Sequence, residues 1–363
     1  MKYKLKDIFD LQMGKTPSRN NTEYWNTEEH KWISIADLTK TGKYISETKE
    51  CLSNRAIDDS GIKVIPANTV VMSFKLSIGK TAITAEDMYS NEAIMAFHDK
   101  HVVKILPEYI YYMFKYKNWD EGSNKAVMGK TLNKATLSEV EIDICSLEEQ
   151  REIVKVLDKM MSVLDGRETE LSLLDDLIKA RFVEMFGDES NPLGWDVVNV
   201  EDVATVQVGV VIKPAQYYTD AANGVRAFRS LNIGSMYIKD NDWVYFSEEG
   251  NSKNAKSILK ENDLIIVRSG APGTACVVTK EYAGCNAIDI IIAHPDMNKV
   301  NPYYLCAYTN LPHGKRQIDE GTGGAAQQHF NVGKYNKLQL MLPPIEKQDE
   351  FVLFMEQVDK SKF

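Results

Sequence analysis

The sequence has few of the features that mark secreted, membrane-anchored or metal-binding proteins. Its 363 residues include only five cysteines, which are scattered and form no Cys-x-x-Cys pair. Neither a zinc site nor a disulfide framework is therefore indicated. No apolar run approaches the roughly 18 residues that a membrane span requires. Residues 1–5 carry charge with no apolar core behind them, which argues against a signal peptide. We expect a cytoplasmic protein with reduced cysteines.

Signs of a phosphate-binding loop are also scarce. Gly79-Lys80-Thr81 and Gly129-Lys130-Thr131 resemble the end of such a loop. The loop also needs a glycine five residues before its second glycine, and those positions hold Phe74 and Asn124. Both segments are better explained as loops that touch a DNA backbone or as ordinary turns.

Two further patterns suggest chemistry but do not support it. Asn301-Pro302-Tyr303-Tyr304 resembles the tetrapeptide of amino-methyltransferases, but its third residue is not proline and no Gly-rich cofactor loop follows an early strand. We expect it to begin a short helix. The six histidines have no metal-ligand spacing, and His98 and His101 lack acidic company in the sequence, so we expect surface residues. The sequence thus predicts a non-catalytic chain with no metal and no cofactor of its own.

The net charge of −9 is unfavourable for a DNA-binding protein, but the acidity is local. Residues 146–190 carry 6 basic and 12 acidic side chains, whereas residues 1–145 carry 20 of each. Residues 191–345 carry 14 and 15. Neutral domains can still present a basic face, because the surface distribution of charge sets the local potential. The composition therefore permits DNA binding without indicating it.

The chain repeats itself with an offset of about 195 residues. A period of this length indicates a duplicated domain rather than a solenoid. The matches are collinear, and each copy ends in a hydrophobic strand followed by a helix that opens Leu/Ile-Glu-x-Gln. They include Gln12-Met13-Gly14 with Gln207-Val208-Gly209, residues 64–83 with 258–278, residues 107–109 with 302–304, and residues 144–150 with 342–348.

Each copy predicts the same order of elements. A short β-rich opening leads to a Gly/Pro turn, which is residues 14–18 in the first copy. Strands, a short aromatic helix, a Gly-rich loop and a last strand follow. The predicted strands are 64–65, 69–73, 80–84 and 140–145 in the first copy and 264–268, 275–279 and 337–342 in the second. The aromatic helices are 107–116 and 302–308, and the Gly-rich loops are 122–131 and 321–328.

Residues 147–186 predict one long helix. Ser146 suits the N-cap, the first turn is acidic, and Gly187 and Pro192 end the helix. At roughly 1.5 Å per residue it would be about 60 Å long. Its apolar residues lie alternately four and three residues apart, with one polar interruption at Arg167. This spacing is typical of a heptad seam. The seam residues are Ile153, Leu157, Met160, Leu164, Leu171, Leu174 and Ile178. A second helix over 345–363, with Phe351 and Phe354 among its apolar positions, predicts an antiparallel coiled-coil pair between the two domains. Two helices that merely link and pack the domains are the alternative.

This organisation resembles the specificity subunits of Type I restriction–modification systems over essentially the whole chain. Residues 14–18, 180–187 and 342–348 carry the resemblance, jointly and in duplicate. It implies an α/β (α+β) fold with two tandem target recognition domains at 1–145 and 191–344, a conserved spacer helix at 146–190 and a shortened distal helix at 345–363. The implied partners are double-stranded DNA, two methyltransferase subunits that carry S-adenosylmethionine, and restriction/translocase subunits. Two diverged readers related by a pseudo-twofold axis would meet inverted, unequal half-sites about one helical turn apart.

Loops should supply the DNA contacts, because phosphate contacts position a reader and base-edge contacts give it specificity. In the first domain the candidates are Lys15, Thr16, Ser18, Arg19, Lys75, Ser77, Lys80, Lys130 and Thr131. In the second they are Arg226, Arg229, Arg268, Ser269, Thr322, Gln327 and Gln328. Arg229 and Arg268 suit guanine, and Gln327 or Gln328 suits adenine. The seam residues with Phe351 and Phe354 are the candidates for partner binding.

The second helix is under half as long as the first, which departs from the family pattern. The far half of the seam therefore has no obvious partner within the chain, and self-association is one way to cover it. A silent or regulatory subunit, which binds methyltransferase without forming a working enzyme, is the alternative function. A stand-alone enzyme is a weaker idea, which the missing cofactor motifs oppose.

Overall fold

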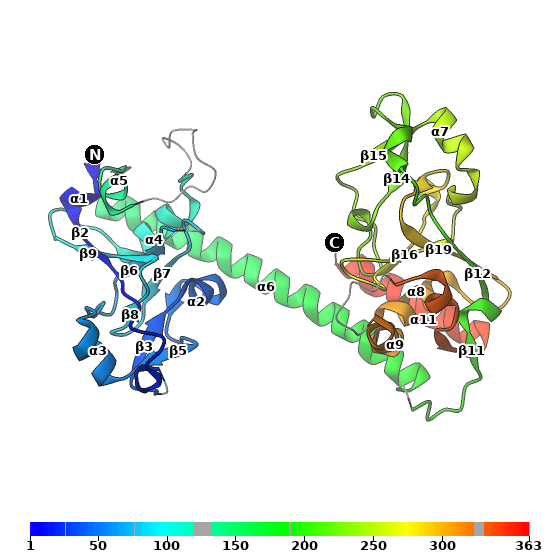
Figure 1. The fold of residues 1–363 in the computed structure, drawn as a ribbon, viewed down its shortest axis with the longest axis horizontal. Helices are drawn as coiled ribbons and strands as arrows, with labels where there is room; N and C mark the ends of the chain where they lie inside the picture. The colour runs from blue at the N-terminus through cyan, green and yellow to red at the C-terminus, as the bar shows by residue number, and fades with distance from the viewer. Residues whose placement is uncertain (26, 76, 120–132, 189, 323–329, 363) are drawn as a thin grey trace. The chain divides into compact units, whose positions relative to one another are not determined.

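A computed structural model describes residues 1–25, 27–75, 77–119, 133–188, 190–322 and 330–362. The chain divides into two compact units, Met1–Gly166 and Arg167–Phe363. Helix α6 (Leu147–Phe186) begins in unit 1 and ends in unit 2. Each unit is described by itself (Figure 1).

Unit 1 is built on a sheet with the strand order β2-β9-β6-β7-β4. Neighbouring strands are antiparallel except β7 and β4, which are parallel. The bounds are β2 (Phe9–Met13), β9 (Ile94–Asp99), β6 (Val70–Ser73), β7 (Thr81–Thr84) and β4 (Tyr44–Ile45).

Both faces of this sheet are covered, so its central strands are apolar without alternation. Met72 and Phe97 point to one core, where they meet Phe114 of α4 (Pro107–Tyr116). Val71 and Ala96, which precede Met72 and Phe97 in their strands, point to the core on the opposite face of the sheet. Strand β6 lies in the middle of the sheet, beside the helix that covers it (Figure 1).

Smaller elements complete unit 1. One sheet has the order β5-β3-β8, and β1 pairs antiparallel with β10. Their bounds are β5 (Glu50–Leu52), β3 (His30–Ile33), β8 (Tyr89–Ser90), β1 (Lys2–Lys4) and β10 (Glu141–Asp143), with helices α1 (Leu5–Ile8), α2 (Ile35–Lys40), α3 (Asn54–Ser60) and α5 (Lys134–Ser138) and the 3-10 turn η1 (Thr22–Tyr24).

Unit 2 repeats the central arrangement with the order β12-β19-β16-β17, all antiparallel. Leu264 and Ile266 face one core, and Ile265 and Val267 face the other. The bounds are β12 (Ala204–Val208), β19 (Ile290–Pro295), β16 (Leu264–Val267) and β17 (Ala275–Val277).

The remaining elements of unit 2 surround that sheet. A second sheet has the order β13-β15-β14-β18, and β11 pairs with β20 as β1 does with β10. The strands are β13 (Tyr218–Thr219), β15 (Val244–Ser247), β14 (Gly224–Phe228), β18 (Asn286–Ala287), β11 (Val197–Asn199) and β20 (Gln339–Met341). The helices are α7 (Glu248–Lys253), α8 (Pro302–Asn310), α9 (Pro312–Thr322), α10 (Val332–Asn336) and α11 (Ile345–Ser361), with 3-10 turns η2 (Val200–Asp202), η3 (Pro214–Tyr217), η4 (Ser230–Asn232), η5 (Ala255–Ser257) and η6 (Lys280–Tyr282).

The ends of α6 follow the sequence signals. The Ser146 hydroxyl accepts from the Glu149 amide at 3.3 Å, while the Glu149 carboxylate accepts from the Ser146 amide at 2.9 Å. This reciprocal pair is a capping box. Gly187 ends the helix in the left-handed region, with φ of +85°. The predicted helix 147–186 is therefore confirmed.

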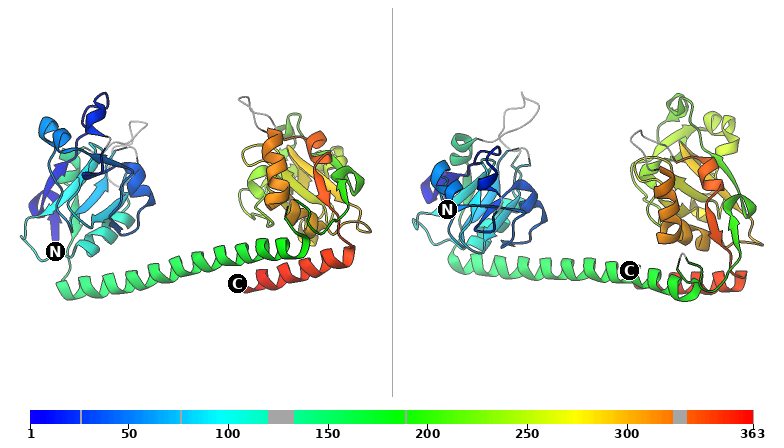
Figure 2. Two further views of the ribbon diagram at one scale, coloured as in Figure 1. Left: turned by 90° about the horizontal axis from the view of Figure 1, so that it is seen from below. Right: turned by 60° about the horizontal axis from the view of Figure 1, so that its bottom comes forward.

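Helix α11 runs antiparallel to the part of α6 that belongs to unit 2 (Figure 2). Arg181 lies 3.3 Å from Glu350, and Asp175 lies 2.9 Å from Lys362. Phe182 packs on Phe351 with ring centroids 5.2 Å apart. The mixed α/β class, the duplicated domain and the antiparallel pair are confirmed.

Candidate nucleic-acid interface

A glycine begins the loop after β2 in unit 1 and the loop after β12 in unit 2. In both units it lets the loop pass close to the backbone of the segment before β9 or β19. A Cβ at Gly14 would lie 2.2 Å from the Ser90 carbonyl oxygen, and one at Gly209 would lie 2.4 Å from that of Ala287. Real Cβ atoms do not come so close, so both positions require glycine. Residues 15–19 and 210–214 follow these glycines and form the post-β2 and post-β12 loops.

A second loop is the hairpin turn at the centre of each sheet. Gly79 in the β6–β7 turn has φ of +89°, and Gly273 in the β16–β17 turn has φ of +82°. Each donates its amide to the last residue of the preceding strand, Ser73 or Val267, at 2.9 and 3.0 Å. Gly79-Lys80-Thr81 therefore leads into a strand, whereas a phosphate-binding loop leads into a helix.

The segments that border the Gly-rich loops contact these turns. Trp119 lies against Gly79, where a Cβ would be 3.0 Å from the indole. In unit 2 the Phe330 amide donates to the Arg268 carbonyl at 3.1 Å. The candidates Lys130, Thr131, Gln327 and Gln328 lie outside the described residues, as does the side chain of Thr322.

In unit 1, Thr16 binds a carboxylate that sequence reasoning missed, and the charges of Lys75 and Arg19 act on the same carboxylate. The Thr16 hydroxyl donates to Glu92, and this hydrogen bond lowers the pKa of Glu92, with smaller contributions from the charges of Lys75 and Arg19. Glu92 thus contacts the post-β2 loop through Thr16 and feels the charge of Lys75 in the β6–β7 turn. Ser77 and Lys80 lie in the same turn as Lys75.

The side chain of Arg19 is held by an ion pair and by an aromatic ring. Its guanidinium pairs with the Glu50 carboxylate, with Nη2 3.0 Å from Oε2, and lies 3.8 Å from the ring centroid of Trp25. Ser18 is exposed, and its carbonyl accepts from the Trp25 indole at 3.1 Å. The Lys15 ammonium donates to the Ser60 carbonyl. The predicted cations of this loop are thus already engaged with protein groups.

In unit 2 the predicted residues form two groups. Arg226 and Arg229 belong to β14 and the residue after it. Arg226 lies 3.8 Å from Asp240 and 5.5 Å from the Trp243 ring centroid, and Arg229 donates to the Asp242 carbonyl.

Arg268 and Ser269 belong to the β16–β17 turn. The Arg268 guanidinium pairs with Asp289 and donates from Nε to the Phe330 carbonyl at 3.3 Å. Sequence reasoning sought only donors and missed the acceptors Glu92 and Asp289. The available signal was an acidic residue shortly before the strand that pairs with β2 or β12.

The predicted seam residues divide between three environments. Leu157 packs on the core of unit 1. In unit 2, Ile178 and Phe351 are buried, Leu174 and Phe354 pack against them, and Leu171 is half-buried. The expectation that the far half of the seam has no partner within the chain is therefore wrong, because α11 packs against it. Ile153, Met160 and Leu164 are exposed, at 56% for Met160 and 55% for Leu164. Val156 and Val163 are also exposed on this stretch of helix, which we call the exposed stripe of α6.

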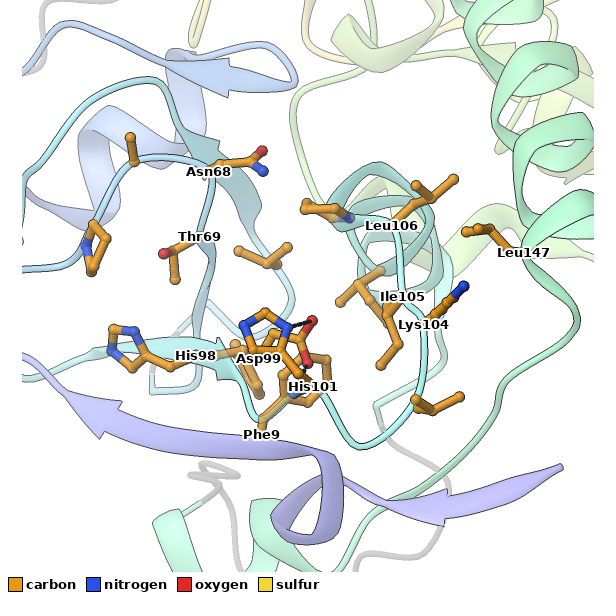
Figure 3. A pocket seen from close by; sticks show the side chains of 17 residues that line it. Phe9, Asn68, Thr69, His98, Asp99, His101, Lys104, Ile105, Leu106 and Leu147 are labelled. Atoms are coloured by element: carbon orange, nitrogen blue, oxygen red, sulfur yellow. Dashed lines mark hydrogen bonds and ion pairs between the residues drawn. The ribbon is translucent and has the colours of Figure 1, made fainter.

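A cavity of about 650 Å³ in unit 1 is lined by none of the loop residues described above (Figure 3). Its floor includes Phe9 and Phe97, and it reaches Leu147 at the start of α6. His101 lies 3.2 Å from Asp99, so the expectation that it lacks acidic company is wrong. No group of three metal-ligating side chains occurs among the described residues.

The chain thus contains one domain twice, and each copy carries a loop held by a glycine and a hairpin turn at its main sheet. A model of the Type I restriction modification DNA specificity domain matches residues 1–172 and again 192–363. The chain belongs to this family, whose specificity subunits are non-catalytic DNA-recognition subunits. No described helix combines the length and hydropathy that a membrane span requires.

Relatives match over nearly the full chain. The Type I restriction enzyme MjaIX specificity subunit of Methanocaldococcus jannaschii is 23% identical over 94% of this chain and 82% of its own length. The EcoprrI specificity subunit of Escherichia coli is 21% identical over 98% and 86%.

Solved structures share the fold. The S subunit of the M. genitalium Type I restriction–modification system has a TM-score of 0.55 at 13% identity and covers all of this chain and 90% of its own. A chain from a structural study of assembly in the type I R-M system has a TM-score of 0.57 at 16% identity, again with 100% and 90% coverage.

Proposed function

We propose that this chain recognises a bipartite, asymmetric DNA site, each unit reading one half, and directs a methyltransferase and restriction subunits to it. One observation carries the proposal. The same loop framework occurs in both units, held by Gly14 and Gly79 in one and by Gly209 and Gly273 in the other, while its tips differ. A shared framework supplies the same approach to the duplex, and different tips supply different base contacts.

The tips differ in chemistry. The post-β2 loop presents Lys15 and Thr16, whereas the post-β12 loop presents the exposed apolar residues Val211 and Ile212. Apolar side chains contact the methyl group of thymine, and lysine contacts phosphate or guanine. Unequal half-sites follow from this difference.

The exposed stripe of α6 supports the docking of partner subunits. Contiguous apolar side chains on a helix surface mark interaction sites more often than scattered ones do. The stripe lies on a segment with twice as many acidic as basic residues, which favours a partner surface with an apolar centre and a basic rim. A stoichiometry of two methyltransferase subunits, one for each repeat, completes the proposal.

A methylation map tests the DNA part. The chain is co-expressed with the methyltransferase subunit in a host that lacks other methylation, and modified adenines are located by genomic sequencing. A two-part motif with a fixed unspecified gap and unequal halves is expected. A palindromic motif or one continuous block would contradict the proposal. A soluble complex without methylation would favour the silent-subunit alternative.

The partner part has its own test. Met160→Lys should leave thermal stability unchanged, because the side chain is 56% exposed, and should weaken methyltransferase binding at least tenfold. Ser162→Lys, an exposed polar position two residues along the same helix, is the matched control. Equal affinities of both variants in titration calorimetry would exclude the exposed stripe as the docking surface.

A further inference from the structure

The β16–β17 turn of unit 2 holds an arginine in a fixed position. Only 16% of the Arg268 side chain is exposed, although arginine in a turn is ordinarily free in solvent. Its Nε donates to the Phe330 carbonyl at 3.3 Å, and its Nη1 donates to Asp289. A guanidinium has five N–H groups, so these two bonds leave up to three for another partner.

Asp289 is held in place independently of Arg268. Its amide donates to the Val210 carbonyl at 3.1 Å, and Ile288 before it forms a parallel bridge with Val210. Its own φ is +48°, a region that residues other than glycine rarely adopt and that persists only where the surroundings impose it. The carboxylate is 45% exposed at the rim of the turn.

These contacts join three segments at one guanidinium. Asp289 connects Arg268 to the post-β12 loop, and Phe330 connects it to the border of the Gly-rich loop. Three anchored segments restrict the rotation of a side chain that otherwise loses much conformational entropy on binding. An arginine fixed in this way has the planar, oriented edge that bidentate recognition of guanine requires.

We propose that Asp289 is a positioning residue that sets Arg268 to read a guanine in the half-site of unit 2. This inference rests on the proposed function, because it assumes that unit 2 reads DNA. The equivalent turn of unit 1 has Phe74, buried, where unit 2 has Arg268, as the matching bonds of Gly79 and Gly273 show. Unit 1 therefore lacks this device, and the guanine belongs to one half-site only.

The test compares base preference at every position of the motif for wild type, Arg268→Ala and Asp289→Asn, by binding to a library of randomised half-sites. Arg268→Ala should lower the preference for guanine at one position of the unit 2 half-site by at least fivefold. Asp289→Asn keeps an acceptor but removes the charge, and it should lower the preference at the same position, leaving the others unchanged. Asp289→Gly, which also suits the left-handed backbone, should do the same.

Glu184→Gln is the matched control, because Glu184 pairs with Arg181 at 2.8 Å on α6, far along the chain from the turn. A uniform loss of affinity on all sequences in the Asp289 variants, or an unchanged preference, would overturn the assignment. So would failure of both Asp289 variants to fold, since the carboxylate would then be structural. If wild type itself shows no preference in that half-site, the proposed function fails instead.

Discussion

Gln150 and Gln348 occupy the same place in the two repeats and make the same three hydrogen bonds. Gln150 accepts from the Leu106 amide at 2.9 Å and donates to the carbonyls of Lys104 and Cys145, both at 3.0 Å. Gln348 accepts from the Asn301 amide at 2.8 Å and donates to the carbonyls of Lys299 and Pro343 at 3.2 and 2.8 Å.

Both glutamines are fully buried, and each ties the start of a helix to the segment before the aromatic helix. Gln150 belongs to α6 and Gln348 to α11, so the glutamine of the repeated Leu/Ile-Glu-x-Gln pattern has a structural role. It satisfies three backbone groups that would otherwise lack this partner. The duplicated helices leave their domains in the same way for this reason.

Replacement of either glutamine should destabilise the fold. Gln150→Ala or Gln348→Ala leaves three backbone groups without their partner, at a cost of about 2–4 kcal/mol in the free energy of unfolding. Urea unfolding followed by circular dichroism measures the change. Gln357→Ala on the exposed face of α11 is the control and should change little. A loss below about 1 kcal/mol in both buried variants would contradict this account.

The sequence predicted the regular elements well where one physical signal dominates. The aromatic helix 107–116 matches α4 residue for residue, and 147–186 matches α6, because periodicity and caps act locally. Helix α9 was not predicted, because Gly314 and Gly321 weaken its helical pattern and packing in the fold compensates.

The candidate site was harder to predict than the fold. The repeat located Gly14 and Gly209, and it placed Lys75 between two predicted strands and Arg268 at the end of another. It could not show that Thr16 donates to Glu92 or that Arg268 pairs with Asp289, because these partners lie 76 and 21 residues apart in sequence. Such pairs depend on strand register, which periodicity alone does not specify.

Addition of a single methyl group at the loop glycines should disrupt DNA binding. Gly14→Ala or Gly209→Ala forces a Cβ to within 2.2 or 2.4 Å of a carbonyl oxygen, so the backbone must shift. We expect a destabilisation of about 1–3 kcal/mol and displacement of the loop that follows.

The measurement is fluorescence anisotropy with DNA that contains the mapped motif, beside a thermal melt. Each variant should weaken binding to the half-site that its own unit reads. Binding to the other half-site should be affected less. Gly42→Ala is the control, since no atom lies within 4 Å of its Cβ position. Unchanged affinity in both loop variants would show that the post-β2 and post-β12 loops do not contact DNA.

Acid should remove a contribution that Lys4 and Lys6, near the N-terminus, make to the stability of unit 1. Hydrogen bonds and charges from Lys6 and then Lys4 lower the pKa of Glu139 to about 2. A lowered carboxyl pKa stabilises the fold above the unfolded value of about 4.3, and this stabilisation disappears as the pH falls towards 2. Glu139→Gln should therefore lower the melting temperature near neutral pH, and the gap from the wild type should close as the pH falls from about 4.3 to about 2.

High salt should reduce the same gap, because Glu139 and its lysines are half exposed and solvent screens them. Glu141→Gln, an exposed neighbour on β10, is the control and should show a smaller gap at every pH. A gap for Glu139→Gln that stays constant between neutral and acid conditions would show that these ion pairs do not stabilise unit 1.

The salt dependence of binding should separate phosphate contacts from base contacts. If Lys75 contacts a phosphate, Lys75→Ala weakens binding equally on all sequences and reduces the slope of log affinity against log salt by about 1. Lys155→Ala on α6 removes the same charge away from the loops and should leave the slope unchanged. Arg268→Ala should change base preference more than slope.

This set of variants distinguishes the two kinds of contact because counterion release follows charge neutralisation at phosphates, whereas base preference depends on directed hydrogen bonds. A slope unchanged by Lys75→Ala would remove Lys75 from the interface, and equal slopes for Lys75→Ala and Arg268→Ala would mean that both residues bind phosphate. Affinity independent of salt in the wild type would exclude DNA as the target of these loops altogether.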